Sequence, residues 1–204
     1  MAEISDFYMF SNALRRTALH LRPVAPDIDD GAIVRAHITP KEPVVFEHSS
    51  CSRPMDLAGT ELPGMNLLSS RAIDLMREHG FTGWRTYAVE VTGKNKEAVE
   101  GYHGLQVYGR CGPIDDSKSR QVWREPVVEG GPRFQVWLGH YFDVDTWDGS
   151  DFFMPAEVGG RENLLMYVTE RVKIAFEKAK LTNVEFEPAT EGVNYHFPLR
   201  FQTD

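Results

Sequence analysis

The chain has 204 residues and a formal net charge of −8 at neutral pH, because 30 acidic side chains outnumber 22 basic ones. Hydrophobic residues make up 42% and charged residues 25% of the sequence, a composition typical of a folded globular protein and not of a disordered one. The negative charge argues against direct binding to nucleic-acid phosphates and favours a basic partner.

Nothing in the sequence indicates export or a membrane anchor. Met1–His20 lacks the basic-then-apolar order of a secretory signal, and no apolar run approaches the length that crosses a bilayer. Cys51 and Cys111 are too few for a disulfide framework, so reduced and structurally buried thiols are expected. We therefore expect a cytoplasmic protein that binds neither membrane nor nucleic acid. The sequence leaves its oligomeric state open.

The first third of the chain predicts short extended segments separated by turns. The aromatic run Phe7–Phe10 is typical of an edge strand, and Pro23–Gly31, rich in proline and aspartate, predicts a loop. Strands are predicted at Ile33–Ile38 and Val44–His48. Ser49–Pro63 is expected to be an irregular connection that leads to the first long helix.

The stretch Leu68–Val91 recurs one hundred positions later without a gap, beginning at Val168. In both copies the side chains at positions i, i+4, i+7, i+8 and i+11 mark one face of a helix. These residues are Leu68, Ala72, Leu75, Met76 and His79 in the first copy, and Val168, Val172, Ala175, Phe176 and Ala179 in the second.

Each predicted helix has a start signal and is followed by a turn and a strand. Ser69 and Thr169 stand at the N-cap, where a side-chain oxygen accepts from a free backbone N–H, and Gly80 supplies a left-handed stop. Extended segments follow at Trp84–Val91 and Val184–Glu187. The unit is therefore helix, turn, strand, used twice. Chance similarity between two amphipathic helices is the alternative.

Two arginines, Arg71 and Arg171, occupy matching positions in the first turns of the predicted helices, and Thr82 matches Thr182 in the turns that follow. The shared residues argue against chance similarity. The positive end of a helix dipole repels a cation, so each arginine needs compensation. A carboxylate from the facing lobe or stacking on an aromatic ring would supply it. An anionic ligand is the alternative.

The second half of the chain completes the predicted fold. Strands are predicted at Gly101–Cys111 and Phe134–Phe142, with a polar loop at Asp115–Arg120 between them. An amphipathic helix needs a sheet or a second copy to cover its apolar stripe, so the repeat predicts an α+β fold. We expect one domain, residues 1–204, with two related lobes, residues 1–100 and 101–204, each with a helix-turn-strand unit packed on mainly antiparallel sheet.

The segment from Phe134 to Gly160 contains five carboxylates and no lysine or arginine, interleaved with aromatic residues. Aromatic anchors surrounded by charge of one sign are typical of a protein interface, because the rings supply desolvated contact area and the charges steer a complementary partner. The predicted partner-binding residues are Tyr141, Asp143, Asp145, Trp147, Asp148 and Asp151. The alternative is structural, with the rings in the core and the aspartates capping turns.

The same region and other parts of the chain contain residues of the types that bind metals or catalyse reactions. The aspartates from Asp143 to Asp151 with Gly149 are reminiscent of a calcium loop, but the glycine and the terminal ligand fall at the wrong positions. His48 with Cys51, and His103 with Cys111, offer zinc-ligand or nucleophile types without the tight spacing of a strong motif. No glycine-rich phosphate loop follows a predicted strand, so we expect no cofactor and no metal.

Four segments of the chain resemble a known group of proteins. These segments are Gly109–Ile114, Trp147–Phe153, Tyr167–Arg171 and Leu181–Pro188. The closing segment, a helix begun by Thr with Glu-Arg and ended by Leu-Thr before a strand and a proline, resembles the immunity proteins of bacterial polymorphic toxin systems. A related group carries paired Cys-x-x-Cys-Gly motifs, which this chain lacks, so the resemblance implies no metal site here.

The resemblance implies inhibition by occlusion: a cytoplasmic protein that binds a cognate toxin domain and blocks it without catalysis. Many such toxins attack nucleic acid through basic clefts, which an acidic surface would fill in place of phosphates. The competing hypothesis is a small hydrolase or transferase in which His140 acts as acid or base with nearby Asp143 and Asp145.

Overall fold

The computed structural model describes residues 2–13, 15–25, 28–126, 128–157, 164–194 and 200–201. Its helices are η1 (Ile4–Asp6), α1 (Asp30–Val34), α2 (Ser70–Glu78), η2 (Asp116–Lys118), η3 (Val144–Thr146) and α3 (Glu170–Lys178). Its strands are β1 (Phe7–Asn12), β2 (His20–Pro23), β3 (Val44–Ser50), β4 (Leu57–Thr60), β5 (Leu67–Ser69), β6 (Trp84–Tyr87), β7 (Val89–Thr92), β8 (Tyr102–Val107), β9 (Gly109–Cys111), β10 (Arg120–Arg124), β11 (Phe134–Leu138), β12 (Phe152–Pro155), β13 (Tyr167–Thr169), β14 (Val184–Pro188), β15 (Val193–Asn194) and β16 (Arg200–Phe201).

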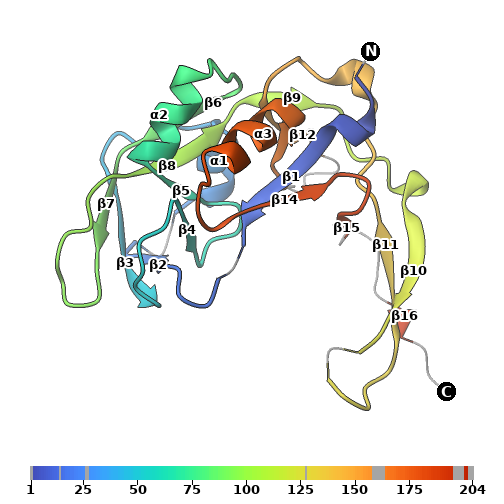
Figure 1. The fold of residues 1–204 in the computed structure, drawn as a ribbon, viewed down its shortest axis with the longest axis horizontal. Helices are drawn as coiled ribbons and strands as arrows, with labels where there is room; N and C mark the ends of the chain where they lie inside the picture. Colours follow the sequence, from blue (N-terminus) through green and yellow to red (C-terminus); the bar gives the residue numbers. More distant parts are fainter. Residues whose placement is uncertain are drawn as a thin grey trace.

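The α+β prediction is confirmed, because a few helices pack on mixed, mostly antiparallel sheets (Figure 1). The two long helices, α2 and α3, lie on the same side of the sheets and contact each other. Ser69 is the N-cap of α2 and accepts a hydrogen bond from the Ala72 backbone N–H, as predicted. Gly80 follows with a φ of 61°, the expected left-handed stop.

Several local predictions were wrong. The run Phe7–Phe10 lies in β1, which pairs with β13 on one side and β14 on the other, so it is not an edge. The predicted strand Ile33–Ile38 overlaps α1, whose N-cap Asp29 accepts a hydrogen bond from the Ala32 N–H. This cap fixes a helical turn before the β-branched residues can extend. Strand β4 lies in the stretch Ser49–Pro63 that was expected to be irregular.

The two largest sheets repeat one arrangement. One has the strand order β14-β1-β13-β12-β9, and the other has the order β6-β8-β5-β4-β2 followed by β3 and β7. Position by position, every neighbouring pair is antiparallel except the last, β12–β9 in one sheet and β4–β2 in the other, which is parallel in both. The sequence repeat therefore extends beyond helix, turn and strand to a five-stranded unit.

The two repeats exchange a strand. Strand β1 comes first in the chain, yet it pairs with β13 and β14 of the second repeat, whereas β8 pairs with β5 and β6 of the first. The division of the chain at residue 100 stays a prediction, but these two strands lie across it. Each half of the chain therefore supplies a strand that the sheet of the other half contains.

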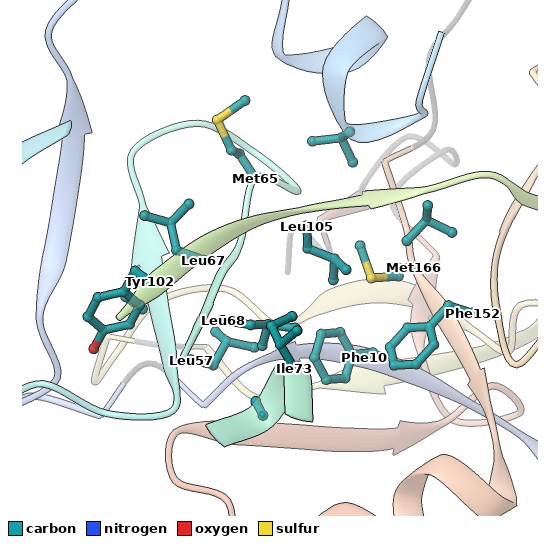
Figure 2. Packing of buried hydrophobic residues seen from close by; sticks show 14 of the residues in the cluster. Phe10, Leu57, Met65, Leu67, Leu68, Ile73, Tyr102, Leu105, Phe152 and Met166 are labelled. Atoms are coloured by element: carbon teal, nitrogen blue, oxygen red, sulfur yellow. The ribbon is translucent and has the colours of Figure 1, made fainter. Parts of the chain in front are cut away.

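The two sheets share one large hydrophobic core. Phe10 on β1 contacts the rings of Phe152 and Phe176, with centroids 5.8 and 5.9 Å apart. Figure 2 shows Phe10 and Phe152 beside Leu68 and Ile73 of the first repeat, so the exchanged strand β1 carries side chains of the common core. Burying these apolar side chains stabilises the paired sheets together.

A smaller sheet extends from this body. Strands β10 and β11 form an antiparallel hairpin that projects away from the two repeats in Figure 1, and β11 also pairs with β15 and β16. The predicted strand Phe134–Phe142 is confirmed over Phe134–Leu138, which forms β11. The strand stops there because Gly139 follows with a φ of 98°. The partner strand β10 was not predicted.

Candidate functional site

Asp151, one of the predicted partner-binding residues, is only 5% exposed. One carboxylate oxygen accepts hydrogen bonds from the backbone N–H of Thr82, at 2.9 Å, and from its hydroxyl, at 3.2 Å. The other accepts from the Thr169 hydroxyl at 3.0 Å and pairs with Arg171 Nε at 3.0 Å. Asp151 therefore joins the start of α3 to the turn before β6 of the other repeat.

Asp56 makes the same set of contacts in the first repeat, and it is 7% exposed. Its Oδ2 accepts from the Thr182 N–H at 2.8 Å and from the Thr182 hydroxyl at 2.9 Å, and it pairs with Arg71 Nη1 at 2.9 Å. Its Oδ1 accepts from the Ser69 hydroxyl at 2.8 Å. We call these two sets of contacts, centred on Asp56 and Asp151, the carboxylate junctions.

The arginines of the junctions also join the two helices. Arg171 Nη2 donates to the carbonyl of His79 at the end of α2, at 2.9 Å, and Arg71 Nη2 donates to the carbonyl of Ala179 at the end of α3. The Arg171 guanidinium also lies 4.9 Å from the centroid of the Phe81 ring. Each cation is thus compensated by protein groups, although the carboxylate comes from its own repeat and not from the facing one.

Asp143 and Asp148 cap turns while their side chains stay exposed. Asp143 accepts a hydrogen bond from the backbone N–H of Asp145 at 3.1 Å and is the N-cap of η3. Asp148 accepts from the backbone N–H groups of Arg110, at 2.8 Å, and Ser150, at 3.0 Å. The structural alternative therefore applies to these two residues, without removing their charge from the surface.

Asp145 differs from its neighbours. Its side chain is exposed, and within the described part of the chain its carboxylate has no hydrogen-bond or ion-pair partner. A charge in this position contributes to the surface potential without a visible structural role.

The aromatic residues of the segment divide into buried and half-buried groups. Phe142 and Phe153 lie in the second core cluster, and Phe152 lies in the main one. Trp147 is half-buried, its ring centroid lies 5.0 Å from that of Phe7, and its indole N–H donates to the Ser150 carbonyl at 2.9 Å. Between Tyr141 and Phe153, the rings that reach the surface are Tyr141 and Trp147, and Phe134 and Trp137 on β11 are half-buried as well.

Two further acidic turns lie beside this segment. The first turn is η1. It lies beside the segment because the next residue, Phe7, contacts Trp147, and because Ile4 of η1 packs against the same core cluster. The second turn is η2. The residues that lead to it contact the segment through a hydrogen bond from the Gly112 N–H to the Thr146 hydroxyl, at 2.7 Å. We call the resulting surface the acidic end, defined by the carboxylates of Glu3, Asp6, Asp115, Asp116, Asp143, Asp145 and Asp148 around Tyr141 and Trp147.

Two neighbouring side chains lower the pKa of Asp115 in the acidic end. A hydrogen bond from Ser117 is the largest cause that lowers the pKa of Asp115, and the ammonium of Lys118, 3.4 Å away, acts in the same direction. Both contacts favour the ionised form of Asp115.

His140 lies inside the protein. Its ring is fully buried, Nε2 lies 2.9 Å from the Val193 carbonyl, and the ring packs edge-on against Tyr167 at 6.0 Å. A Cβ on Gly192 would lie 2.8 Å from the imidazole, so the backbone closes over it. This position does not favour general acid–base chemistry on a substrate from solvent.

Within the described ranges, the candidate zinc ligands His48, Cys51, His103 and Cys111 do not form a metal site. Among the described residues, no group of three or more His, Cys, Asp or Glu side chains could hold a metal ion. His103 Nε2 lies 3.0 Å from the Ser70 hydroxyl, and burial raises the pKa of the Cys111 thiol to about 12. Cys111 is buried as expected, but Cys51 is exposed, so the expectation of two buried thiols was wrong for Cys51.

In the part of the chain that the structure describes, no helix is long and apolar enough to cross a membrane.

Sequence comparisons name no relative for this chain. No protein-family model matches it, and a search among curated proteins found no match either.

Proposed function

We propose that this protein is an immunity protein of a bacterial toxin system, which binds a cognate toxin domain in the cytoplasm and occludes it without catalysis. The observation that carries the proposal is the acidic end, where three short 3-10 helices with their caps, and the turn at Asp148, present seven carboxylates beside two half-buried rings. Carboxylates outnumber cations around these partly exposed rings, although Lys118 on η2 pairs with Asp115, and an excess of negative charge suits a basic protein surface.

The two parts of this surface would have different roles. The exposed carboxylates, Asp145 above all, would steer a basic toxin cleft and raise the association rate. The half-buried rings of Tyr141 and Trp147 would supply apolar contact area once the toxin has docked. Trp147 is held in place by Phe7 and by the Ser150 carbonyl, so little side-chain entropy is lost on binding. Asp151 is left out of the proposed surface, because its buried carboxylate belongs to a junction.

The proposal predicts a stoichiometric complex with the toxin domain encoded beside this gene, and rescue of growth when the two are expressed together. The test of the surface uses the double variant Asp145→Lys/Asp148→Asn, in which the asparagine keeps an oxygen to accept in the turn. At low salt its association with the toxin should be about 10-fold slower than that of the wild type, and the difference should shrink as salt screens the charges.

A matched control is available on the other repeat. Glu90 and Glu100 are exposed and lie outside the acidic end, so Glu90→Lys/Glu100→Gln makes the same change in net charge. If this control slows association as much as the acidic-end variant, the effect comes from net charge and the proposed surface is wrong. Failure of the neighbouring toxin to bind or to be neutralised would contradict the function itself.

A further inference from the structure

A cavity of about 200 Å³ lies at the end of β1 that is remote from the acidic end. Phe7, at the start of β1, contacts Trp147, whereas Asn12, at the last position of β1, lines the cavity. The volume exceeds that of several waters at about 30 Å³ each, so it has room for a small ligand group. The lining residues are Asn12, Arg15, Arg16, Ala18, Leu19, His20, Ser50, Cys51, Gly59 and Asn183.

The same position in the other repeat is filled. His20 on β2 pairs with Gly59 on β4, and Arg110 on β9 pairs with Met154 on β12 in the matching register. The Arg110 guanidinium turns back toward the preceding residues and donates to the carbonyls of Val107 on β8 and Gly109 on β9, at 2.8 and 2.9 Å. An internal side chain thus occupies in one repeat the position that is open in the other.

A second arginine closes the filled position. Arg35 is 2% exposed, donates to the Pro155 carbonyl at 2.8 Å and pairs with Glu157 at 2.8 Å, and its own carbonyl accepts from Arg110. Among the described residues, no buried arginine pair fills the cavity of the first repeat, where Arg15 and Arg16 are exposed. A Cβ on Gly59 would lie 2.9 Å from Asn12 Nδ2 and 3.3 Å from His20 Cδ2, so the glycine allows these two polar side chains to approach the strand.

The charge around the open cavity is positive, although the protein as a whole carries −8. In the part of the chain that the structure describes, no aspartate or glutamate lines it. Arg15 and Arg16 are exposed, and within the described residues their guanidinium groups have no carboxylate partner, unlike those of Arg22, Arg71, Arg120 and Arg171. Their backbones are nevertheless fixed, since the Arg15 N–H donates to Asn183 Oδ1 at 3.2 Å and the Arg16 carbonyl accepts from the Cys51 thiol.

We propose that this cavity binds the phosphate group of a small phosphorylated molecule. Two guanidinium groups, the Ser50 hydroxyl and the His20 imidazole provide donors of the kind that phosphate oxygens accept. A carboxylate-free rim avoids repulsion of the anion. The site is separate from the acidic end, so its test does not depend on the proposed toxin binding.

Cys51 lines the cavity and reports on its occupancy. It is exposed whereas Cys111 is buried, so iodoacetamide, a neutral reagent, should alkylate Cys51 selectively. The rate of alkylation is measured by intact mass and peptide mapping with increasing inorganic phosphate or glucose 6-phosphate, against sodium chloride at equal ionic strength. Both phosphate compounds should slow the reaction at least about 3-fold at saturation, and the one that protects at lower concentration identifies free phosphate or a phosphate ester as the source.

The variant Arg15→Gln/Arg16→Gln should raise the half-protecting phosphate concentration at least about 10-fold. Arg77→Gln/Arg120→Gln removes the same charge from exposed ion pairs elsewhere and should behave as the wild type. Thermal melting checks that both variants fold. The proposal is overturned if neither phosphate compound protects Cys51, if chloride protects it equally, or if protection persists in Arg15→Gln/Arg16→Gln.

Discussion

The two repeats agree in their junctions and differ at the ends of their strands. Asp56 and Asp151 each bind a hydroxyl and an arginine at the start of their own helix, and the N–H and hydroxyl of a threonine from the other repeat. At the strand ends, one repeat is filled by Arg110 and Arg35 where the other has an open cavity. The shared contacts maintain the fold, and the differences are where separate binding roles could arise.

The exchange of strands explains why the junctions have to be shared. Since β1 pairs with β13 and β14, and β8 pairs with β5 and β6, neither repeat has a complete sheet by itself. Each junction then holds a turn of one repeat against the first residues of a helix in the other. Stability therefore depends on contacts between the repeats at least as much as on contacts within them.

The largest expected effect follows from removing a junction carboxylate. Asp151→Ala and Asp56→Ala each leave the N–H and hydroxyl of a threonine, a hydroxyl at the start of a helix and an arginine without their buried acceptor. Several hydrogen bonds to a charged group are lost together, so each variant should lower the free energy of unfolding by about 3–5 kcal/mol. Urea denaturation of the wild type and both variants measures the loss.

Asp74→Ala is the matched control, because the Asp74 side chain is 72% exposed and pairs only with Arg77 on the same helix. Its cost should stay within about 0.5 kcal/mol. A loss at Asp56 or Asp151 as small as that of the control would mean that the corresponding junction does not hold the repeats together.

A smaller effect should separate the two turns that follow the helices. Gly83 and Asn183 occupy matching positions with φ angles of 85° and 61°. A Cβ on Gly83 would lie 2.0 Å from the Phe152 carbonyl oxygen, whereas Asn183 fits and donates from Nδ2 to the Leu57 carbonyl at 2.8 Å. Gly83→Ala should therefore cost about 2–4 kcal/mol, and Asn183→Gly about 1–2 kcal/mol.

Thermal and urea unfolding of the two variants test the difference between these turns. The control is Gly80→Ala, which has a similar φ of 61° but open space around its Cβ position, so it isolates the backbone cost. Equal losses for Gly83→Ala and Gly80→Ala would show that the approach of Phe152 is not limiting.

The long helices α2 and α3 and their order could be predicted from the sequence, because their signals are local, whereas α1 was predicted as loop and strand. The apolar face, the Ser69 cap and the Gly80 stop all lie in α2 or directly beside it. The second copy of this pattern, one hundred residues later, predicts α3 in the same way. The junctions could not be predicted in the same way. Asp56 precedes the Ser69 that it binds by 13 residues, whereas Asp151 precedes Thr169 by 18, so an equal spacing does not reveal them as equivalents.

The strand exchange and the orientation of the aromatic residues also could not be predicted from the sequence. The pattern in Phe7–Phe10 indicates a strand, but its partners β13 and β14 lie more than 150 residues away. Aromatic residues among aspartates suit a surface or a core equally well. Phe142 and Phe153 are in the core because the adjacent strands bring Phe7 and Tyr167 against them, whereas Tyr141 and Trp147 remain half-buried at the surface.

The smallest expected difference concerns the junction arginines. Both side chains are more than half exposed and each reaches the end of the opposite helix, but only Arg171 lies over an aromatic ring, Phe81. The matching residue beside Arg71 is Leu181. Arg171→Gln should therefore cost about 0.5–1 kcal/mol more than Arg71→Gln, the size of a solvent-exposed cation–π contact.

A double-mutant cycle isolates that contact. Phe81→Leu makes the second junction resemble the first, and it also loses core packing, because Phe81 is 7% exposed. The cycle subtracts the packing cost, so the coupling between Arg171→Gln and Phe81→Leu should be about 0.5–1 kcal/mol, whereas Arg71→Gln and Phe81→Leu should be additive. A coupling near zero in the first pair would assign the role of Arg171 to Asp151 and the His79 carbonyl alone, and the two junctions would then be energetically equivalent.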